Sequence, residues 1–267
     1  MNLELFIARR IAHNGSGNRP GVMVRIAVVA VALSVTVMIL ALAVIMGFKR
    51  EITDRVTGFS AQVEVADLRS AGSIESVPVL RSEQLERTIR SAGEVVRLTP
   101  YAVKGGVVKT PDAILGVMLK GVDGGYEWSF FRDHLLEGEL PRVGDSIRTK
   151  EILISRSVAR EMGLAPGDKV EMLFVESEKS PRRDRFKVSG IYATGMDEFD
   201  RSVAMTDLRN VQRLADWSSE EVSGYEVTLA DFLQAEDFSR RLNDMLLDSD
   251  REAFWDLTAR SAQERFP

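Results

Sequence analysis

The feature that most constrains this chain is an apolar stretch without any charge, running from Ile26 to Phe48. Arg25 and Lys49 bound it on either side. A helix of this length measures roughly 34 Å at about 1.5 Å per residue, which is enough to cross a hydrocarbon core of about 30 Å. Ser34 and Thr36 are tolerable in lipid because their hydroxyls can bond back to carbonyls of the same helix. The stretch therefore predicts a membrane-spanning helix.

Two other interpretations of this stretch are weaker. A buried helix of a soluble core seldom runs so far without a charged residue. Ala41-Leu42-Ala43 has the pattern of an export-signal cleavage site, but apolar residues continue beyond it to Phe48. A cleaved signal also has a shorter apolar core, of about 7–15 residues. A retained span is favoured over both.

Charge is divided unevenly along the chain. Residues 1–50 hold six cations against Glu4, a net of +5, so residues 51–267 carry −10 of the total of −5. An acidic main domain argues against non-specific binding of nucleic acid, which needs a basic face. Positive residues favour the cytoplasmic side of a membrane. We expect the N-terminus in the cytoplasm and residues 49–267 on the exported side.

The chain before the span, residues 1–22, predicts a cytoplasmic amphipathic segment. Leu3, Phe6, Ile7 and Ile11 share one side of a helical wheel, and Arg10 intrudes on that side. An arginine can bury its stem and keep its charge in water, so a helix lying in the interface is possible. The alternative is a frayed tail. The span itself is assigned to residues 23–48.

The exported part alternates between strand and helix patterns. Ser82 and Ser155 are expected to cap two helices, and Gly163 suits the left-handed end of the second. Thr206 is expected to cap a third helix, and Asp231 with Gln234 has capping-box spacing before a fourth. The pattern predicts a mixed α+β domain of two lobes.

Residues that could perform catalysis are scarce. The chain has no cysteine and only two histidines, His13 and His134, which fall on opposite sides of the predicted membrane. No catalytic triad, histidine metal site or P-loop can be assembled. The acidic residues Asp197, Glu198 and Asp200 lack calcium-loop spacing and are interpreted as a solvated loop. We expect a non-catalytic protein with no cofactor and no metal.

One charged segment, Glu176 to Arg185, is expected to form a loop between two strands. Its arginines Arg182, Arg183 and Arg185 are candidate partner-binding residues, because guanidinium groups suit phosphate headgroups or an acidic partner. The alternative is a soluble hairpin tip whose charges discourage edge pairing.

Several segments in one order resemble a known family. They are E-L-F-I-A-R-R at 4–10, L-K-G-V-D-G-G-Y-E-W-S-F-F at 119–131, L-I-S-R-S-V-A-R-E-M-G-L-A-P-G-D-K-V at 153–170, P-R-R-D-R-F-K-V-S-G-I-Y-A-T-G-M-D-E-F-D at 181–200 and Y-E-V-T-L-A-D at 225–231. With the apolar helix they resemble permease subunits of lipoprotein-releasing ABC transporters, the LolC and LolE type, within the wider FtsX/MacB-like permease group.

The resemblance implies a fold and a set of partners. The fold is an N-terminal transmembrane helix followed by a two-lobed periplasmic α+β domain, with a second lobe inserted near 140–205. The implied setting is the bacterial inner membrane. The implied partners are a cytoplasmic ABC ATPase on a separate chain, a second permease subunit in a homo- or heterodimer, a lipoprotein substrate, membrane lipid and a periplasmic lipoprotein carrier.

Two departures from the family keep alternatives open. Family members continue into three more membrane helices, so the chain is expected to be the N-terminal fragment of a longer permease. The family's carrier-capturing hairpin is longer than residues 176–185, which leaves carrier binding open. The other functions considered are efflux or regulation of cell-wall hydrolases by an FtsX/MacB-type permease, and a single-pass anchored binding or scaffold protein without an ATPase.

Overall fold

The computed structural model describes residues 20–59, 61–70, 76–110, 113–144, 146–176, 179–249 and 254–265. The chain divides into two compact units, Met1–Asp54 and Arg55–Pro267. The predicted amphipathic segment falls almost wholly on residues 1–19, outside the described residues.

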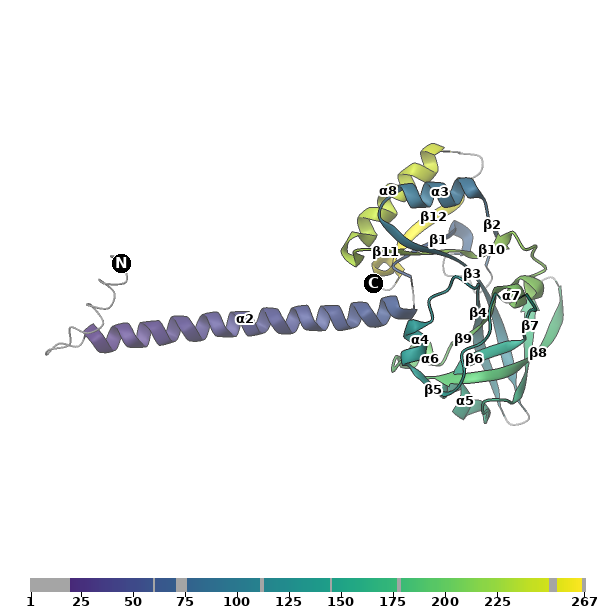
Figure 1. Ribbon diagram of the computed structural model, residues 1–267, viewed down its shortest axis with the longest axis horizontal. Coiled ribbons are helices and arrows are strands. Elements are labelled where there is room, and N and C mark those ends of the chain that lie inside the picture. Colours follow the sequence, from purple (N-terminus) through teal and green to yellow (C-terminus); the bar gives the residue numbers. More distant parts are fainter. Residues whose placement is uncertain are drawn as a thin grey trace. The chain divides into compact units, whose positions relative to one another are not determined.

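The first helix, α2, runs from Pro20 to Phe59 (Figure 1). Its apolar part, Gly21–Gly47, is 27 residues long and has no residue buried by the protein, so by length and composition it can cross a membrane. Ser34 Oγ donates to Ala30 O at 2.9 Å and Thr36 Oγ1 to Ala32 O at 2.8 Å, as expected. The helix continues for more than two turns beyond Phe48, because residues 49–59 contain no proline and several good helix formers.

The other described helices are short. They are α3 Glu83–Ser91, α4 Ser129–Asp133, α5 Arg156–Met162, α6 Asp197–Asp200, α7 Leu208–Ala215, α8 Ala235–Ser249 and α10 Ala262–Arg265, with the 3₁₀ turns η1 Leu68–Ser70 and η2 Phe232–Gln234.

Ten of the described strands form one mixed sheet in the order β12-β1-β11-β3-β4-β9-β6-β8-β5, with β7 pairing both β3 and β8. The pairs β4–β9 and β6–β8 are parallel and the remaining pairs are antiparallel. The strands are β1 Val63–Asp67, β3 Val95–Lys109, β4 Ile114–Val122, β5 Leu135–Gly138, β6 Glu151–Ser155, β7 Lys169–Glu176, β8 Lys179–Tyr192, β9 Val203–Asp207, β11 Gly224–Leu229 and β12 Leu257–Ser261. A separate small sheet pairs β2 Val79–Leu80 with β10 Glu221–Val222.

Two of the expected helix caps are confirmed, one caps a 3₁₀ turn before its helix, and one is wrong. Ser82 accepts from Leu85 N and Ser155 from Val158 N, both at 3.1 Å, and Gly163 has φ 63°. Asp231 caps η2, which leads into α8. Helix α7 is capped by Asp207 rather than Thr206, whose hydroxyl lies in β9 and donates to Glu151 O at 2.7 Å.

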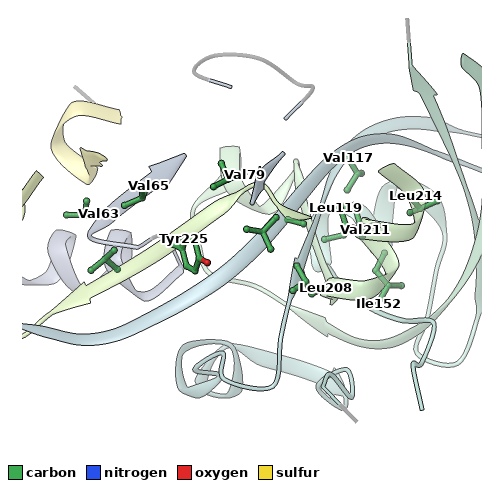
Figure 2. Packing of buried hydrophobic residues seen from close by; sticks show 14 of the residues in the cluster. Val63, Val65, Val79, Val117, Leu119, Ile152, Leu208, Val211, Leu214 and Tyr225 are labelled. Carbon is green, nitrogen blue, oxygen red and sulfur yellow. The ribbon is translucent and has the colours of Figure 1, made fainter. Parts of the chain in front are cut away.

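A buried apolar core runs through the domain. Helices α3 and α8 lie side by side over β1, β11 and β12 (Figure 1), while α7 packs on β3 and β4. Figure 2 shows the valines of β1 with Tyr225, and farther along the core Leu119, Ile152 and Val211. Gly121 permits the close approach of α7, because a Cβ there would lie 2.9 Å from Leu208 Cα. The α+β class is confirmed; the inserted lobe near 140–205 stays a prediction.

Candidate functional site

The three candidate arginines lie on a strand rather than in a loop. Strand β8 begins at Lys179 and pairs with β7 from Lys169↔Lys187 to Glu176↔Lys179, so the expected ten-residue loop is wrong. The connection between the strands, residues 177–178, lies outside the described residues. The physical reason is the alternation along β8, where Asp184 and Phe186 are buried and Arg183 and Arg185 are exposed.

Arg182 faces the opposite side of the sheet from the other two arginines. Its guanidinium donates to Arg213 O at 3.1 Å and to Asp216 Oδ2 at 2.5 Å, at the end of α7. Arg183 and Arg185 are 73% and 76% exposed, and both approach one carboxylate, that of Glu171, at 3.8 Å and 3.4 Å. Arg182 therefore fastens the hairpin to α7, and the other two are open to a partner.

A buried carboxylate, that of Asp184, holds the inner side of this hairpin. Lys150 and Arg213 both donate to it. Burial alone would raise the pKa of Asp184, but the hydrogen bonds from Lys150 and the Arg185 amide, with the two nearby cations, keep that pKa below its usual value. Asp184 thus ties the hairpin to α7 through Arg213 and to the start of β6 through Lys150.

The exposed arginines share a sheet face with an apolar groove that the sequence analysis missed. Val107 pairs with both Leu173 and Gly116, and Leu173 pairs with Arg183, so these side chains project to the same side. We call this the outer face. The groove measures about 390 Å³ and is lined by Gly105, Gly106, Val107, Gly116, Val117, Met118, Leu173, Val175 and Ser202.

The inner face of the same strands belongs to the core. Val108, Val117, Met172 and Phe174 are all buried there. The ring of Phe174 covers Gly106 so closely that a Cβ at Gly106 would lie 2.6 Å from it. The signal for the outer groove was the sequence K-G-G-V-V-K with L-G-V-M, where a glycine is followed two residues later, on the same face of its strand, by an apolar residue.

A second hollow of about 350 Å³ opens between β1, β2, α3 and β12. Two acidic residues line it, Asp67 and Asp256. Arg69 donates to Asp67 Oδ2 at 2.7 Å and also reaches Asp256 at 3.2 Å. The hydrogen bond from Arg69 lowers the pKa of Asp67, so this arginine is used in holding the rim of the hollow together.

The remaining polar clusters are structural. Lys120 Nζ donates to Glu226 at 2.6 Å, and the buried Tyr101 hydroxyl donates to Glu64. Burial and these carboxylates raise the pKa of Tyr101 well above its usual value. Among the described residues no three His, Cys, Asp or Glu side chains converge as a metal site would require.

Burial corrects one interpretation of the acidic residues. Asp200 was expected in a solvated loop, but it is buried and accepts from Thr194 N and from Thr194 Oγ1, the latter at 2.8 Å, because it closes the turn after β8. Nearby, Phe131 is buried and packs edge-on against Tyr192 with ring centroids 5.1 Å apart, so both rings belong to the core.

Comparison with known proteins identifies the family. The sequence model of the MacB-like periplasmic core domain matches residues 26–245. The chain belongs to this family. The MacB-like match begins within the apolar span and ends within α8.

Curated relatives of this MacB-like chain include two proteins named "Lipoprotein-releasing system transmembrane protein LolC". The one from Xylella fastidiosa (strain 9a5c) is 27% identical over 224 residues, 78% of this chain and 50% of the relative. The one from Neisseria meningitidis serogroup B is 26% identical over 225 residues, 80% of this chain and 50% of the relative. The chain thus spans about half the length of these relatives, and the resemblance to LolC and MacB-like permeases is confirmed.

Two solved structures are similar to this chain. The extracellular domain of the ABC-type transporter YknZ from Gram-positive bacteria has a TM-score of 0.48 at 14% identity, covering 74% of this chain and 99% of that one. The periplasmic region of MacB from Actinobacillus actinomycetemcomitans has a TM-score of 0.49 at 14% identity, covering 79% and 92%.

Proposed function

We propose that the chain is the anchoring and periplasmic part of an ABC-transporter permease that releases lipoproteins from the bacterial inner membrane. The observation that carries this proposal is a MacB-like core domain joined to a membrane span in a chain whose curated relatives are named LolC. The N-terminus is cytoplasmic and the domain is periplasmic in this proposal. A cytoplasmic ATPase and a second permease subunit complete the machine, and this chain is not itself an enzyme.

Lipoprotein release needs energy from outside the bilayer. Each acyl CH₂ buried in lipid stabilises anchoring by about 0.8 kcal/mol, so a lipoprotein with several chains does not leave spontaneously. A permease subunit can supply this energy by coupling cytoplasmic ATP hydrolysis to movement of its periplasmic domain. The helical backbone of α2 continues past the apolar span to Phe59, close in sequence to β1 at Val63.

The domain binds its first and last strands together, which suits the transmission of movement. Arg265 of α10 donates to Ala61 O, and its guanidinium lies 3.2 Å from Glu64 Oε2. Ala262 N donates to Gln62 O at 2.8 Å. Displacement of residues 61–64 would therefore move β12 and α10 along with β1.

Depletion of the full-length protein in the native bacterium tests this function. Newly made lipoproteins should accumulate in the inner membrane while other exported proteins reach their destinations. Normal lipoprotein sorting with impaired cell-wall hydrolysis or impaired drug efflux would overturn the proposal in favour of the regulatory or efflux permeases. Normal sorting with no ATPase recovered alongside the protein would favour an anchored scaffold.

A further inference from the structure

The outer face of β3, β4 and β7 is apolar over three adjacent strands although it faces solvent. Val107 lies between Leu173 and Gly116, and Met118 lies beside Gly105 in the same register. Ile114 and Val175 extend the apolar strip and are 68% and 56% exposed. Contiguous exposed apolar surface of this kind marks a binding site more often than singly scattered residues do.

Glycine, which has no side chain, leaves the open space that forms the groove within this strip. A Cβ added at Gly116 would meet no atom within 4 Å, so the space above it is open. The groove of about 390 Å³ falls within the range of about 300–1,000 Å³ typical of small-molecule sites. Ser202 contributes the one polar side chain among its lining residues, so the groove favours a hydrocarbon over a polar ligand.

Positive charge gathers along one end of the strip. Arg183 is paired with Leu173, while Arg185 and Lys109 are both paired with Glu171. Within the part of the sheet that the structure describes, three cations thus face a single carboxylate, and neither arginine is closer than 3.4 Å to it. Guanidinium groups bind phosphate through paired N–H donors.

We propose that this groove binds one acyl chain of an anionic phospholipid, with the phosphate held by Arg183 and Arg185. A phospholipid carries an acyl chain next to a phosphate, and this face likewise carries an apolar strip next to a cationic end. The apolar span of α2 gives the chain a way to be held in a membrane that contains such lipids. The inference does not depend on the transport function proposed above.

The net charge of the domain favours a lipid as the occupant of the groove over a second copy of the chain or an acidic protein. Residues 51–267 carry a net charge of −10, so a second copy or an acidic protein would bring extensive negative surface against negative surface. A single phosphate contacts only the cationic end of the groove. Membrane phospholipid is therefore the occupant that matches both the lining and the local charge.

Photolabelling with single-chain lipids tests the proposal on the full 267-residue chain in phosphatidylcholine nanodiscs. The probes are diazirine-labelled lysophosphatidylglycerol, which is anionic, and the matching lysophosphatidylcholine, which is zwitterionic. Both move through water as monomers. Mass spectrometry should place adducts of the anionic probe on peptides from β3, β4 and β7, with several-fold fewer adducts from the zwitterionic probe.

Variants distinguish binding of the lipid in the groove from a general electrostatic attraction of anionic lipid to the protein. Gly116→Leu fills the open space and should abolish the sheet adducts while leaving the unfolding temperature nearly unchanged. Charge reversal by R183E/R185E should lower them several-fold. The matched control R156E/R160E makes the same charge change at exposed positions of α5 and should leave labelling at the wild-type level.

Four results would overturn the proposal: adducts confined to α2, equal labelling by the two probes, undiminished labelling in a folded Gly116→Leu variant, or an equal loss in R156E/R160E. A photoreactive residue at Val107 that captures a second copy of the chain would assign the groove to dimerisation instead and would also overturn it.

Discussion

The inner and outer faces of β3, β4 and β7 differ in the space available for a side chain at a central glycine of each face. At Gly106, on the inner face, the Phe174 ring fills all the space that a side chain would need. At Gly116, on the outer face, that space is open. Alternate residues of the same strands thus serve two purposes, since the inner set fixes the fold and the outer set is left free for a ligand.

The largest expected effect comes from removing the ring on the inner face. Phe174→Ala leaves a cavity against Gly106 and should lower the free energy of unfolding by about 3–5 kcal/mol. Urea unfolding of the full chain in nanodiscs, followed by tryptophan fluorescence, measures it, because Trp128, Trp217 and Trp255 all lie in the domain. A loss below about 1 kcal/mol would mean that Phe174 is not a core residue.

The glycines themselves give the sharpest test of the two faces. Gly106→Val overpacks the inner face and should cost about 1–3 kcal/mol. Gly116→Val makes the same chemical change on the outer face and should alter stability by no more than about 0.5 kcal/mol. Equal losses in the same urea titration would contradict the difference between the faces.

The stability of the inner face should depend on pH through Asp207. This residue caps α7, the helix that covers β3 and β4. Burial alone would raise the pKa of Asp207, but hydrogen bonds from the Arg209 side chain and amide and from the Gly144 amide outweigh it and lower that pKa. Because the pKa of Asp207 is lower in the folded state than its unfolded-state value of about 3.9, the ionised carboxylate stabilises the fold at a pH above that unfolded-state value. This stabilisation is lost as the pH falls through the folded-state pKa.

We therefore expect Asp207→Asn to flatten the decline of stability below about pH 4, and Asp207→Ala to cost about 0.5–2 kcal/mol at neutral pH. Unfolding temperatures measured from neutral to acidic pH test both expectations. A decline in Asp207→Asn as steep as in the wild type would assign the acid sensitivity to other carboxylates.

The smallest effect is expected at the exposed arginines. R183E/R185E should change the free energy of unfolding by less than about 0.5 kcal/mol, because solvent screens both groups. R182E should cost somewhat more, up to about 1 kcal/mol, since it breaks the bonds to α7. If R183E/R185E were the more destabilising change, the outer arginines would be structural rather than open to a ligand.

The sequence revealed features that depend on neighbours along the chain. The span of α2 follows from an unbroken apolar composition, and the caps at Ser82 and Ser155 from a single residue before a helical pattern. Thr206 was predicted as a cap, but Thr206 and Asp207 are both good capping residues, and only the position where β9 ends decides which of them caps α7.

The features that the sequence did not reveal depend on strand register. The segment at 176–185 was interpreted as a loop because a run of charges is typical of one. Pro181 is tolerated within β8 beside the register shift between Phe174 and Glu176 in the facing strand. The groove needs β7 to lie against β3 at Val107, a pairing between distant segments that local patterns cannot specify.

The most direct test of the two-faced sheet is a pair of photoreactive residues in the full-length protein in native membranes, one at Met118 on the outer face and one at Leu119 on the inner face. We predict that position 118 captures anionic phospholipid and that position 119, which is buried and does not line the groove, captures only segments of its own chain. Capture of the same partners at both positions, or of protein alone at position 118, would contradict the account.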